Sequence, residues 1–367
     1  MTDENLKSTV KATTLCAYCP KMCRFACAVS ETEGKESKTP WAKMSLVYLA
    51  HRGEVNLRSE EEQNALEACT GCGACVEQCA HGNPVSETLF QARGIARTER
   101  SQRFREAFLK TGDVKERDFS EMIGSLPSSD AGAIAYFPGC TRLSQGREKI
   151  EGDLEALSIA TGQEVRLAAL PDGLRCCGYP LYADGQTDVL AEHLPRLSAA
   201  LAGHRVVVTP DPGCAYTLSV VHDALAATPA KRSHHVIPLV EVLGERAERF
   251  AGRSAGLRVR YHDPCYLGRR GRSFEAPRKL LTSALGAPPL EFYMNREHAD
   301  CSGSGGLYPV SDPDGALAMA QRRVHADPNS HAAADAVVSA CPSACRGFEK
   351  TGIKSLDIVD VALGKIK

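Results

Sequence analysis

Short apolar runs and longer amphipathic stretches alternate through the last two thirds of the chain. The apolar runs have the length of buried strands, and they lie at residues 133–137, 164–170, 205–209, 257–261, 290–293 and 336–339. The stretches between them carry apolar residues at helical spacing, at 148–161, 187–203, 277–285 and 313–325. Because strands that alternate with helices form parallel sheets, this pattern predicts two consecutive α/β units.

The first third of the chain lacks such runs and has a helical pattern. Pro40 can occupy the first turn of a helix that stops at Gly53. Ser59 and Glu62 predict a capping box at the start of a second helix. A third helix is expected from Pro84 onwards.

A charged segment of helical pattern, residues 99–130, separates the two regions and ends in a loop that contains Pro, Ser, Asp and Gly. We therefore place a domain boundary at its end. The sequence predicts an α+β multidomain protein, with a helical domain and linker at 1–130 followed by two α/β repeats at 131–250 and 251–367.

Composition and charge exclude several classes of function. The 367 residues contain 44 Lys and Arg against 45 Asp and Glu, so no net field would attract nucleic acid or an anionic membrane. The start of the chain lacks the apolar run of a signal peptide, and no stretch reaches the length of a membrane span. We therefore expect a cytoplasmic protein. Its 16 cysteines then indicate metal or redox chemistry rather than disulfides.

Half of the cysteines lie in two short runs. Residues 16–27 have the sequence C-A-Y-C-P-K-M-C-R-F-A-C, and residues 69–79 have the sequence C-T-G-C-G-A-C-V-E-Q-C. The second run has the cysteine spacing of bacterial ferredoxins, and its small residues let the backbone wrap closely around a cluster. Ala80 replaces the proline that usually follows, and the first run has one extra residue before Cys23. Because four thiolates also suit zinc, two zinc knuckles are the alternative.

The remaining cysteines mark a duplication. In one copy Cys140 is followed by Cys176, and in the other Cys265 is followed by Cys301. The number of residues between the two cysteines is the same in both copies. The sequence C-C-G at 176–178 corresponds to C-S-G at 301–303, so one copy has lost a cysteine. Two adjacent cysteines need a bend in order to face one site, and the following glycine can supply it.

Each copy ends in another cysteine-bearing turn. The D-P sequence that begins at Asp211 aligns with the C-P sequence that begins at Cys341, so Asp211 occupies a cysteine position. On this alignment Cys214 corresponds to Cys345, with one additional residue between the two cysteines of the second copy.

These residues resemble the cysteine-rich CCG domain, which occurs twice in heterodisulfide reductase subunits and in the iron-sulfur subunits of glycolate, lactate and anaerobic glycerol-3-phosphate dehydrogenases. The likeness covers nearly the whole chain, since the first two cysteine runs are similar to the helical ferredoxin domain of such subunits. In two-cluster ferredoxins the fourth cysteine of each run binds the other run's cluster. The resemblance implies two 4Fe-4S clusters, one held by Cys16, Cys19, Cys23 and Cys79 and the other by Cys69, Cys72, Cys75 and Cys27.

The full family motif supplies five thiolates that can hold an open, non-cubane cluster, and neither copy here is complete. The first copy has Asp211 as a harder fifth ligand beside Cys140, Cys176, Cys177 and Cys214. The second copy has Ser302 in place of the fifth cysteine beside Cys265, Cys301, Cys341 and Cys345. The resemblance implies one or two further iron-sulfur clusters in the CCG repeats, and zinc is the alternative for the second site.

Three smaller features are also relevant to the site. Arg269, Arg270 and Arg272 follow a ligand cysteine, and they either receive an anionic substrate or partner or form a solvated helix start. His262 lies three residues before a ligand, Cys265. The glycine-rich run at 303–306 lacks the order of a dinucleotide-binding loop, so we expect it to permit close backbone approach to a cluster.

The resemblance implies an iron-sulfur electron-transfer subunit of an oxidoreductase, inactive alone. Its expected partner is a flavoprotein dehydrogenase or an electron-transfer flavoprotein subunit, because the sequence has no recognisable flavin or nicotinamide site. The alternative is a thiol-disulfide reductase similar to heterodisulfide reductase, in which Cys176 and Cys177 are catalytic. A zinc-stabilised scaffold without redox function is the third hypothesis.

Overall fold

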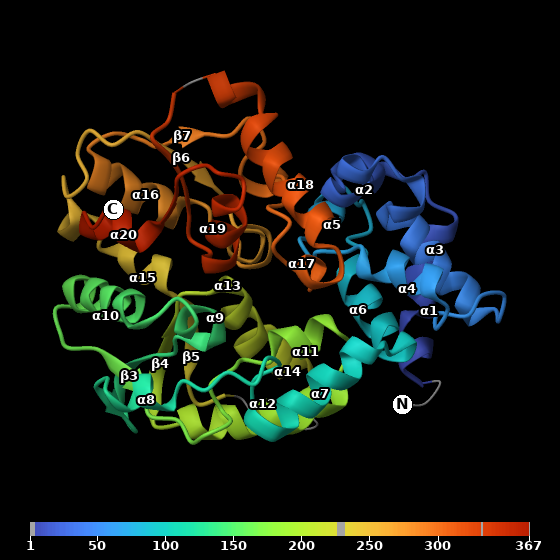
Figure 1. The fold of residues 1–367 in the computed structure, drawn as a ribbon, viewed down its shortest axis with the longest axis horizontal. Helices are drawn as coiled ribbons and strands as arrows, with labels where there is room; N and C mark the ends of the chain where they lie inside the picture. Colours follow the sequence, from blue (N-terminus) through green and yellow to red (C-terminus); the bar gives the residue numbers. More distant parts are fainter. Residues whose placement is uncertain (1–3, 226–231, 332, 367) are drawn as a thin grey trace.

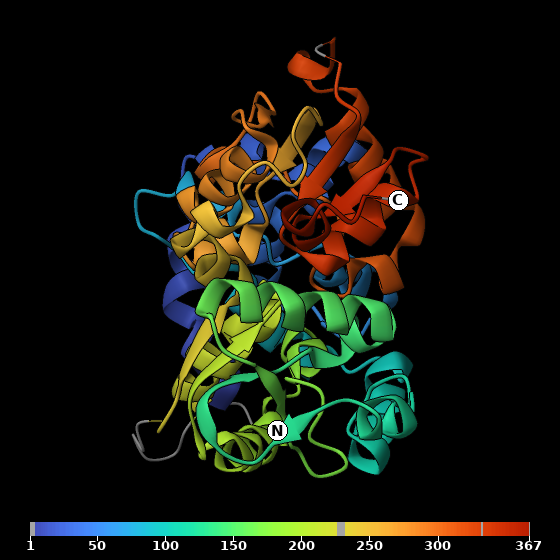
Figure 2. The same cartoon turned by 90° about the vertical axis from the view of Figure 1, so that its left-hand side faces the viewer.

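The computed structural model describes residues 4–225, 232–331 and 333–366, which form three packed parts (Figure 1). Helices of the N-terminal part lie at the right of this view, and two α/β units lie one above the other at the left. The turned view shows helix α10 (Arg147–Thr161) running along the boundary between the two units (Figure 2). Among the residues described, no helix is both long and apolar enough to cross a membrane.

The N-terminal part consists of short helices. Its α-helices are α1 (Glu4–Ala17), α2 (Ala28–Glu33), α3 (Pro40–His51), α4 (Glu60–Glu67), α5 (Ala74–Glu77) and α6 (Val85–Ala96), with 3-10 helices at Met22–Ala26 and Glu36–Lys38. Pro40 opens α3, and the Thr39 hydroxyl caps that helix by accepting a bond from the Ala42 amide at 3.2 Å. Met44 of α3 and Leu89 of α6 belong to the core beneath these helices.

The predicted capping box at α4 is wrong. Ser59 does precede the helix, but its hydroxyl donates to the Glu62 carboxylate and accepts no bond from the helix backbone. The first turn of α4 consists of Glu60, Glu61 and Glu62, whose negative charges interact favourably with the positive end of the helix dipole. The N-terminus of α4 is therefore stabilised by charge instead of a reciprocal cap.

The first α/β unit contains a five-stranded parallel sheet in the order β1-β3-β2-β4-β5. Its strands are β1 (Ser128–Ser129), β2 (Gly132–Tyr136), β3 (Arg166–Ala168), β4 (His204–Thr209) and β5 (His235–Pro238). Its helices are α9 (Gly139–Leu143), α10, α11 (Tyr179–Ala183), α12 (Thr187–Leu201), α13 (Pro212–Tyr216), α14 (His222–Leu225) and α15 (Leu239–Glu245), with a π-turn at Thr217–Val221 and a 3-10 turn at Ala247–Phe250. The strand expected at 164–170 is limited to β3.

The segment that links the N-terminal part to this sheet packs against the first unit. It contains α7 (Glu99–Thr111) and α8 (Ser120–Gly124). Phe104 and Phe108 of α7 share a hydrophobic cluster with Leu190 and Leu194 of α12. The linker helix therefore adds to the core of the first repeat, and the sheet already begins at Ser128.

The second α/β unit repeats this topology with a four-stranded parallel sheet in the order β7-β6-β8-β9. Its strands are β6 (Val259–His262), β7 (Leu290–Glu291), β8 (Ala336–Ser339) and β9 (Ser355–Asp357). Its helices are α16 (Glu275–Leu285), α17 (Tyr308–Ser311), α18 (Pro313–His325), α19 (Pro342–Glu349) and α20 (Ile358–Leu363), with a π-turn at Tyr266–Arg270 and 3-10 turns at Arg296–His298 and Pro328–His331. Since β6, β7, β8 and β9 take the places of β2, β3, β4 and β5, the two units share one strand order.

A buried ion pair joins the two units. Arg142 of α9 lies 2.8 Å from the Asp153 carboxylate of α10 and 2.9 Å from the Asp357 carboxylate at the end of β9. All three side chains are buried, and the units also share one large hydrophobic cluster. The carboxyl ends of the parallel strands, where α/β proteins build their sites, are thereby held facing a common space.

Gly306 is a point of close approach between the second unit and the N-terminal part. A Cβ atom there would lie 2.3 Å from the Cys69 carbonyl oxygen, whereas one at Gly286 would meet nothing within 4 Å. Both glycines have positive φ, 61° at Gly306 and 75° at Gly286.

We expect Gly286→Ala to cost about 1 kcal/mol of unfolding free energy from backbone strain. Gly306→Ala should cost a further ~1–3 kcal/mol because of the clash, measured as a lower thermal midpoint. Equal midpoints would contradict the close approach.

Candidate metal centres

The first group of thiols surrounds the end of α1. The Cys16 sulfur accepts a bond from the Asn83 amide nitrogen Nδ2 at 2.9 Å, and the Cys79 sulfur accepts one from the Asn83 backbone at 3.5 Å. Burial raises the pKa of Cys16 to about 11, and the neighbouring Cys23, Cys19 and Cys79 also raise it. The structure thus brings these four cysteines together. Asn83, which no sequence motif marked, orients two of them.

The second group contains the other cysteines of the two runs. Burial raises the pKa of Cys75 well above its ordinary value, and the nearby Cys72, Cys69 and Cys27 raise it as well. Cys27 therefore lies with the second run, while Cys79 lies with the first. Cys23 of the first run also raises the pKa of Cys75, so the exchange of fourth cysteines that the resemblance implies stays a prediction.

Three buried cations surround the second group, and each donates to backbone carbonyls. Arg93 donates to the Cys69 carbonyl at 2.8 Å and Arg269 to the Cys72 carbonyl at 2.7 Å, while the Lys43 ammonium donates to the carbonyl just before Cys69. A buried positive charge is costly unless an anion offsets it. A centre held by four thiolates supplies such negative charge, so these residues fit an iron-sulfur cluster.

The four thiols of the first repeat converge near the ends of β2 and β4. The sulfurs of Cys140 and Cys176 lie 3.6 Å apart, and Cys177 shares a hydrogen bond with Cys214. Gly178 has φ 84°, which supplies the bend expected after the adjacent cysteines. The bond from Cys177 has the largest single effect and lowers the pKa of Cys214, but burial together with the nearby Asp211, Cys140 and Cys176 raises this pKa to about 12. Coordination to a metal would deprotonate such thiols.

Asp211 occupies the position just before α13, and its carboxylate accepts a bond from the Gly213 amide at 2.8 Å. Burial raises the pKa of this carboxyl group above its ordinary value. The side chain is therefore held as a helix cap beside the thiols of its repeat, where a carboxylate can also act as a metal ligand.

The alignment of Cys214 with Cys345 is wrong. Asp211 and Cys341 are the N-cap residues of α13 and α19, so the residue that corresponds to Cys214 is Ala344. Cys345 lies one residue later, and its thiol donates to the Ser339 and Leu356 carbonyls at 3.6 and 3.5 Å. In an α-helix one residue turns the side chain by about a quarter of a circle.

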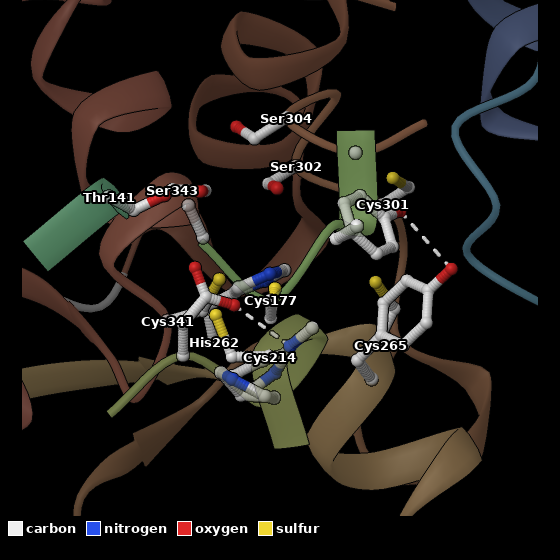
Figure 3. A pocket seen from close by; sticks show the side chains of 18 of the residues that line it. Thr141, Cys177, Cys214, His262, Cys265, Cys301, Ser302, Ser304, Cys341 and Ser343 are labelled. Carbon is white, nitrogen blue, oxygen red and sulfur yellow. Dashed lines mark hydrogen bonds between the residues drawn. The ribbon is translucent and has the colours of Figure 1, made fainter. Parts of the chain in front are cut away.

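One cavity collects the side chains of both repeats (Figure 3). The cavity has a volume of about 100 Å³. Its thiols are Cys140, Cys177 and Cys214 from the first repeat and Cys265, Cys301 and Cys341 from the second. Asp211, His262 and Ser302 also line it, whereas Cys176 and Cys345 do not. The sequence predicted a separate site in each repeat, and the structure instead directs both copies toward one space.

Cys301 lies between this cavity and the second thiol group. Its sulfur and the Thr70 hydroxyl are hydrogen-bonded at 3.3 Å. A hydrogen bond from Cys301 is the main reason why the pKa of Cys72 is well below its ordinary value. The second repeat therefore touches a ligand of the N-terminal part directly. Among the described residues, no three His, Cys, Asp or Glu side chains are arranged to hold a single metal ion.

The arginine run and His262 have structural partners. Arg269 is buried against the Cys72 loop, Arg270 pairs with Glu87 at 2.5 Å and Arg272 pairs with Glu77 at 2.9 Å. The run thus connects the second repeat to the N-terminal part. Burial lowers the pKa of His262 well below its ordinary value, so the imidazole that faces the cavity is neutral at pH 7.

A tyrosine cluster lies beside the cavity, and no sequence motif marked it. The hydroxyls of Tyr179 and Tyr266, from different repeats, are hydrogen-bonded at 3.1 Å. Their rings contact each other and those of Tyr182 and Tyr216, with centroids 5.1–6.4 Å apart. Both hydroxyls face the end of the cavity near the N-terminal part, since Tyr179 also accepts a bond from the Gly306 amide at 3.2 Å.

Comparisons with known proteins agree with this architecture. Residues 134–219 and 259–347 match the cysteine-rich domain family, and residues 12–83 match the 4Fe-4S dicluster domain family. One subunit of the fumarate reductase (CoM/CoB) of Methanothermobacter marburgensis is 28% identical over 359 residues, which cover 92% of this chain and 69% of the relative.

Two other relatives show the same domains. One subunit of the dihydromethanophenazine:CoB-CoM heterodisulfide reductase of Methanosarcina barkeri is 26% identical over 328 residues, covering 82% of this chain and 76% of the relative. Lactate utilization protein A of Oceanobacillus iheyensis is 28% identical over 156 residues, covering 39% of this chain and 61% of the relative. With a dicluster domain followed by two cysteine-rich domains, the chain belongs to the CCG-domain family of iron-sulfur oxidoreductases.

Proposed function

We propose that the chain is the electron-transfer subunit of an oxidoreductase complex and that it exchanges electrons with a flavoprotein partner. A bound iron-sulfur cluster carries one electron at a time, so a two-electron substrate needs several centres in sequence. The observation that supports this function best is the continuity of thiol groups from Cys16 through Cys72 and Cys301 to the cavity.

The protein's own residues would hold, orient and shield these centres. The first two groups supply four thiolates each, and the first repeat supplies Cys140, Cys176, Cys177 and Cys214 with Asp211 beside them. Arg93 and Arg269 would offset negative charge in the second group. In the second repeat, the three thiols on the cavity leave Ser302 as the remaining ligand candidate there.

A second candidate function is reduction of a disulfide in the shared cavity. Two observations favour it: thiols of both repeats face one cavity, and two relatives are named for coenzyme M and coenzyme B chemistry. On this hypothesis the cavity admits the substrate, the thiols of the first repeat hold the reacting centre, and the tyrosine hydroxyls border one end.

Anaerobic purification of the full chain separates the hypotheses. We expect a brown protein that dithionite reduces reversibly but that oxidises no hydroxy acid and reduces no NAD⁺ without a partner, because it lacks a hydride-handling cofactor. Isolation from its native cell should also recover a flavoprotein. Turnover of a hydroxy acid or NADH by the chain alone would exclude the subunit hypothesis. Reoxidation of the dithionite-reduced chain by a small disulfide would favour the second candidate, and a colourless protein that contains zinc would exclude both.

A further inference from the structure

Large apolar side chains are exposed around the first thiol group. Tyr18 is 79% exposed, Phe25 75% and Met22 60%. With Leu15 they flank three ligand cysteines in sequence, and we refer to these four residues as the docking patch. Met22 and Phe25 are three residues apart in a 3-10 helix, so they project from the same side of it.

This exposure is concentrated in one short segment of the chain. Ten large apolar residues are exposed in the described part of the chain, and five of them lie between residues 10 and 25. Single exposed apolar residues are ordinary on protein surfaces, whereas a contiguous group indicates a binding surface. Aromatic side chains and Met are also the residue types enriched at such interfaces.

The charges of the same segment have one sign. Residues 10–27 contain Lys11, Lys21 and Arg24 and no acidic residue, although acidic residues slightly outnumber basic ones in the whole chain. Lys21 lies 3.7 Å above the Trp41 ring instead of pairing with a carboxylate, while Arg24 pairs with Glu36 at 2.8 Å. An apolar centre with a basic rim complements a partner that has an acidic rim.

The position of the docking patch also selects the kind of partner. Buried Arg93 and Arg269 and the Gly306 loop lie against the second thiol group, and three of the four first-repeat thiols, those of Cys176, Cys177 and Cys214, are buried. The docking patch instead adjoins the group that contains Cys16 and Cys23. These two thiols are less deeply buried than the thiols of the second run, Cys69, Cys72 and Cys75. A protein seated there would approach the outer end of the series of thiol groups.

We propose that the docking patch binds a one-electron carrier protein whose redox centre is surrounded by acidic side chains. This inference rests on the proposed electron-transfer function. It adds where the partner docks and which charge the partner presents.

The test measures electron transfer from a protein donor to the full cluster-loaded chain. Flavodoxin hydroquinone, an acidic one-electron donor, is mixed with the oxidised chain in a stopped-flow instrument. We expect the second-order rate constant to fall as ionic strength rises from about 0.01 M to about 1 M, since salt screens the attraction. The double variant Tyr18→Ser with Phe25→Ser should lower that rate constant about tenfold or more, and Lys21→Glu should lower it and weaken its salt dependence.

Matched controls separate docking from damage to the centres. Tyr293 is 62% exposed and lies in the second repeat, so Tyr293→Ser should leave the flavodoxin rate unchanged. Dithionite, a small reductant, should reduce every variant as it reduces the parent chain, with the same iron content. Failure of dithionite reduction in the parent would refute the proposed function itself, whereas dithionite reduction with an unaltered flavodoxin rate in the double variant would refute only the docking patch. Faster electron exchange with cytochrome c, whose redox centre is surrounded by lysines, than with flavodoxin would also overturn the proposal. The proposal would likewise fail if the double variant lost binding to anionic phospholipid vesicles but kept its rate with flavodoxin.

Discussion

Replacing Cys177 with serine should remove most of the spectroscopic signal and iron of the first repeat while the two N-terminal clusters remain. Cys177 is buried, is hydrogen-bonded to Cys214 and lines the shared cavity. A serine hydroxyl is a harder and weaker iron ligand than a thiolate. About eight irons, those of two four-iron clusters, should therefore stay bound. Metal analysis and electron paramagnetic resonance of the anaerobic protein measure both quantities.

Two further variants make this result specific. Cys345→Ser changes a thiol that is also buried but is bonded to backbone carbonyls, so we expect it to leave iron content and spectra unchanged. Ser302→Cys adds a thiol on the cavity wall of the second repeat and should change little unless that repeat needs another ligand. An unaltered first-repeat signal in Cys177→Ser would remove the reason for regarding that site as special. Loss of iron in Cys345→Ser would indicate that Cys345 is a metal ligand.

The sequence predicted much of the architecture because its signals were local. Three strands of each repeat and the long helices between them follow from apolar runs and helical periodicity, and the cysteine runs follow from ligand spacing. The error at Cys345 came from aligning cysteines by type. The start of α19 sets the register instead, and only the structure shows that Ala344 takes the place of Cys214.

Long-range contacts were beyond reach of the same reasoning. The shared cavity depends on how the two repeats face each other, and the Arg142 ion pair that joins them links residues far apart in sequence. Arg269 follows a ligand cysteine in a basic run, which by itself suggests a surface. Its bond to the Cys72 carbonyl exists only because the N-terminal part packs against the second repeat. The hydrophobic periodicity of the sequence does not predict contacts between segments that are far apart in the chain.

Arg93 is the side chain that connects all three parts. Its guanidinium donates to five carbonyls: those of Leu66, Glu67 and Cys69 in the N-terminal part, Ala183 in the first repeat and Gly306 in the second. Arg93 is buried, so water cannot replace these bonds when they are lost. The planar five-donor fork of arginine is therefore required here, and a lysine could reach only some of the carbonyls.

Arg93→Met should consequently lower the free energy of unfolding by about 3–5 kcal/mol, the usual cost of removing one partner from a buried charged network. The thermal midpoint of the loaded protein should fall by on the order of 10 °C. The stability of Arg93→Lys should lie between that of Arg93→Met and that of the parent chain, because lysine keeps the positive charge but lacks the planar fork of donors.

Arg58 supplies the control, since it is exposed and its bond to the Ile95 carbonyl is 3.4 Å long. Arg58→Met should change stability by less than about 0.5 kcal/mol. If both methionine variants melted at the same temperature, the three parts would not depend on Arg93 for their packing. Other contacts would then have to hold the Cys69 loop against the two repeats.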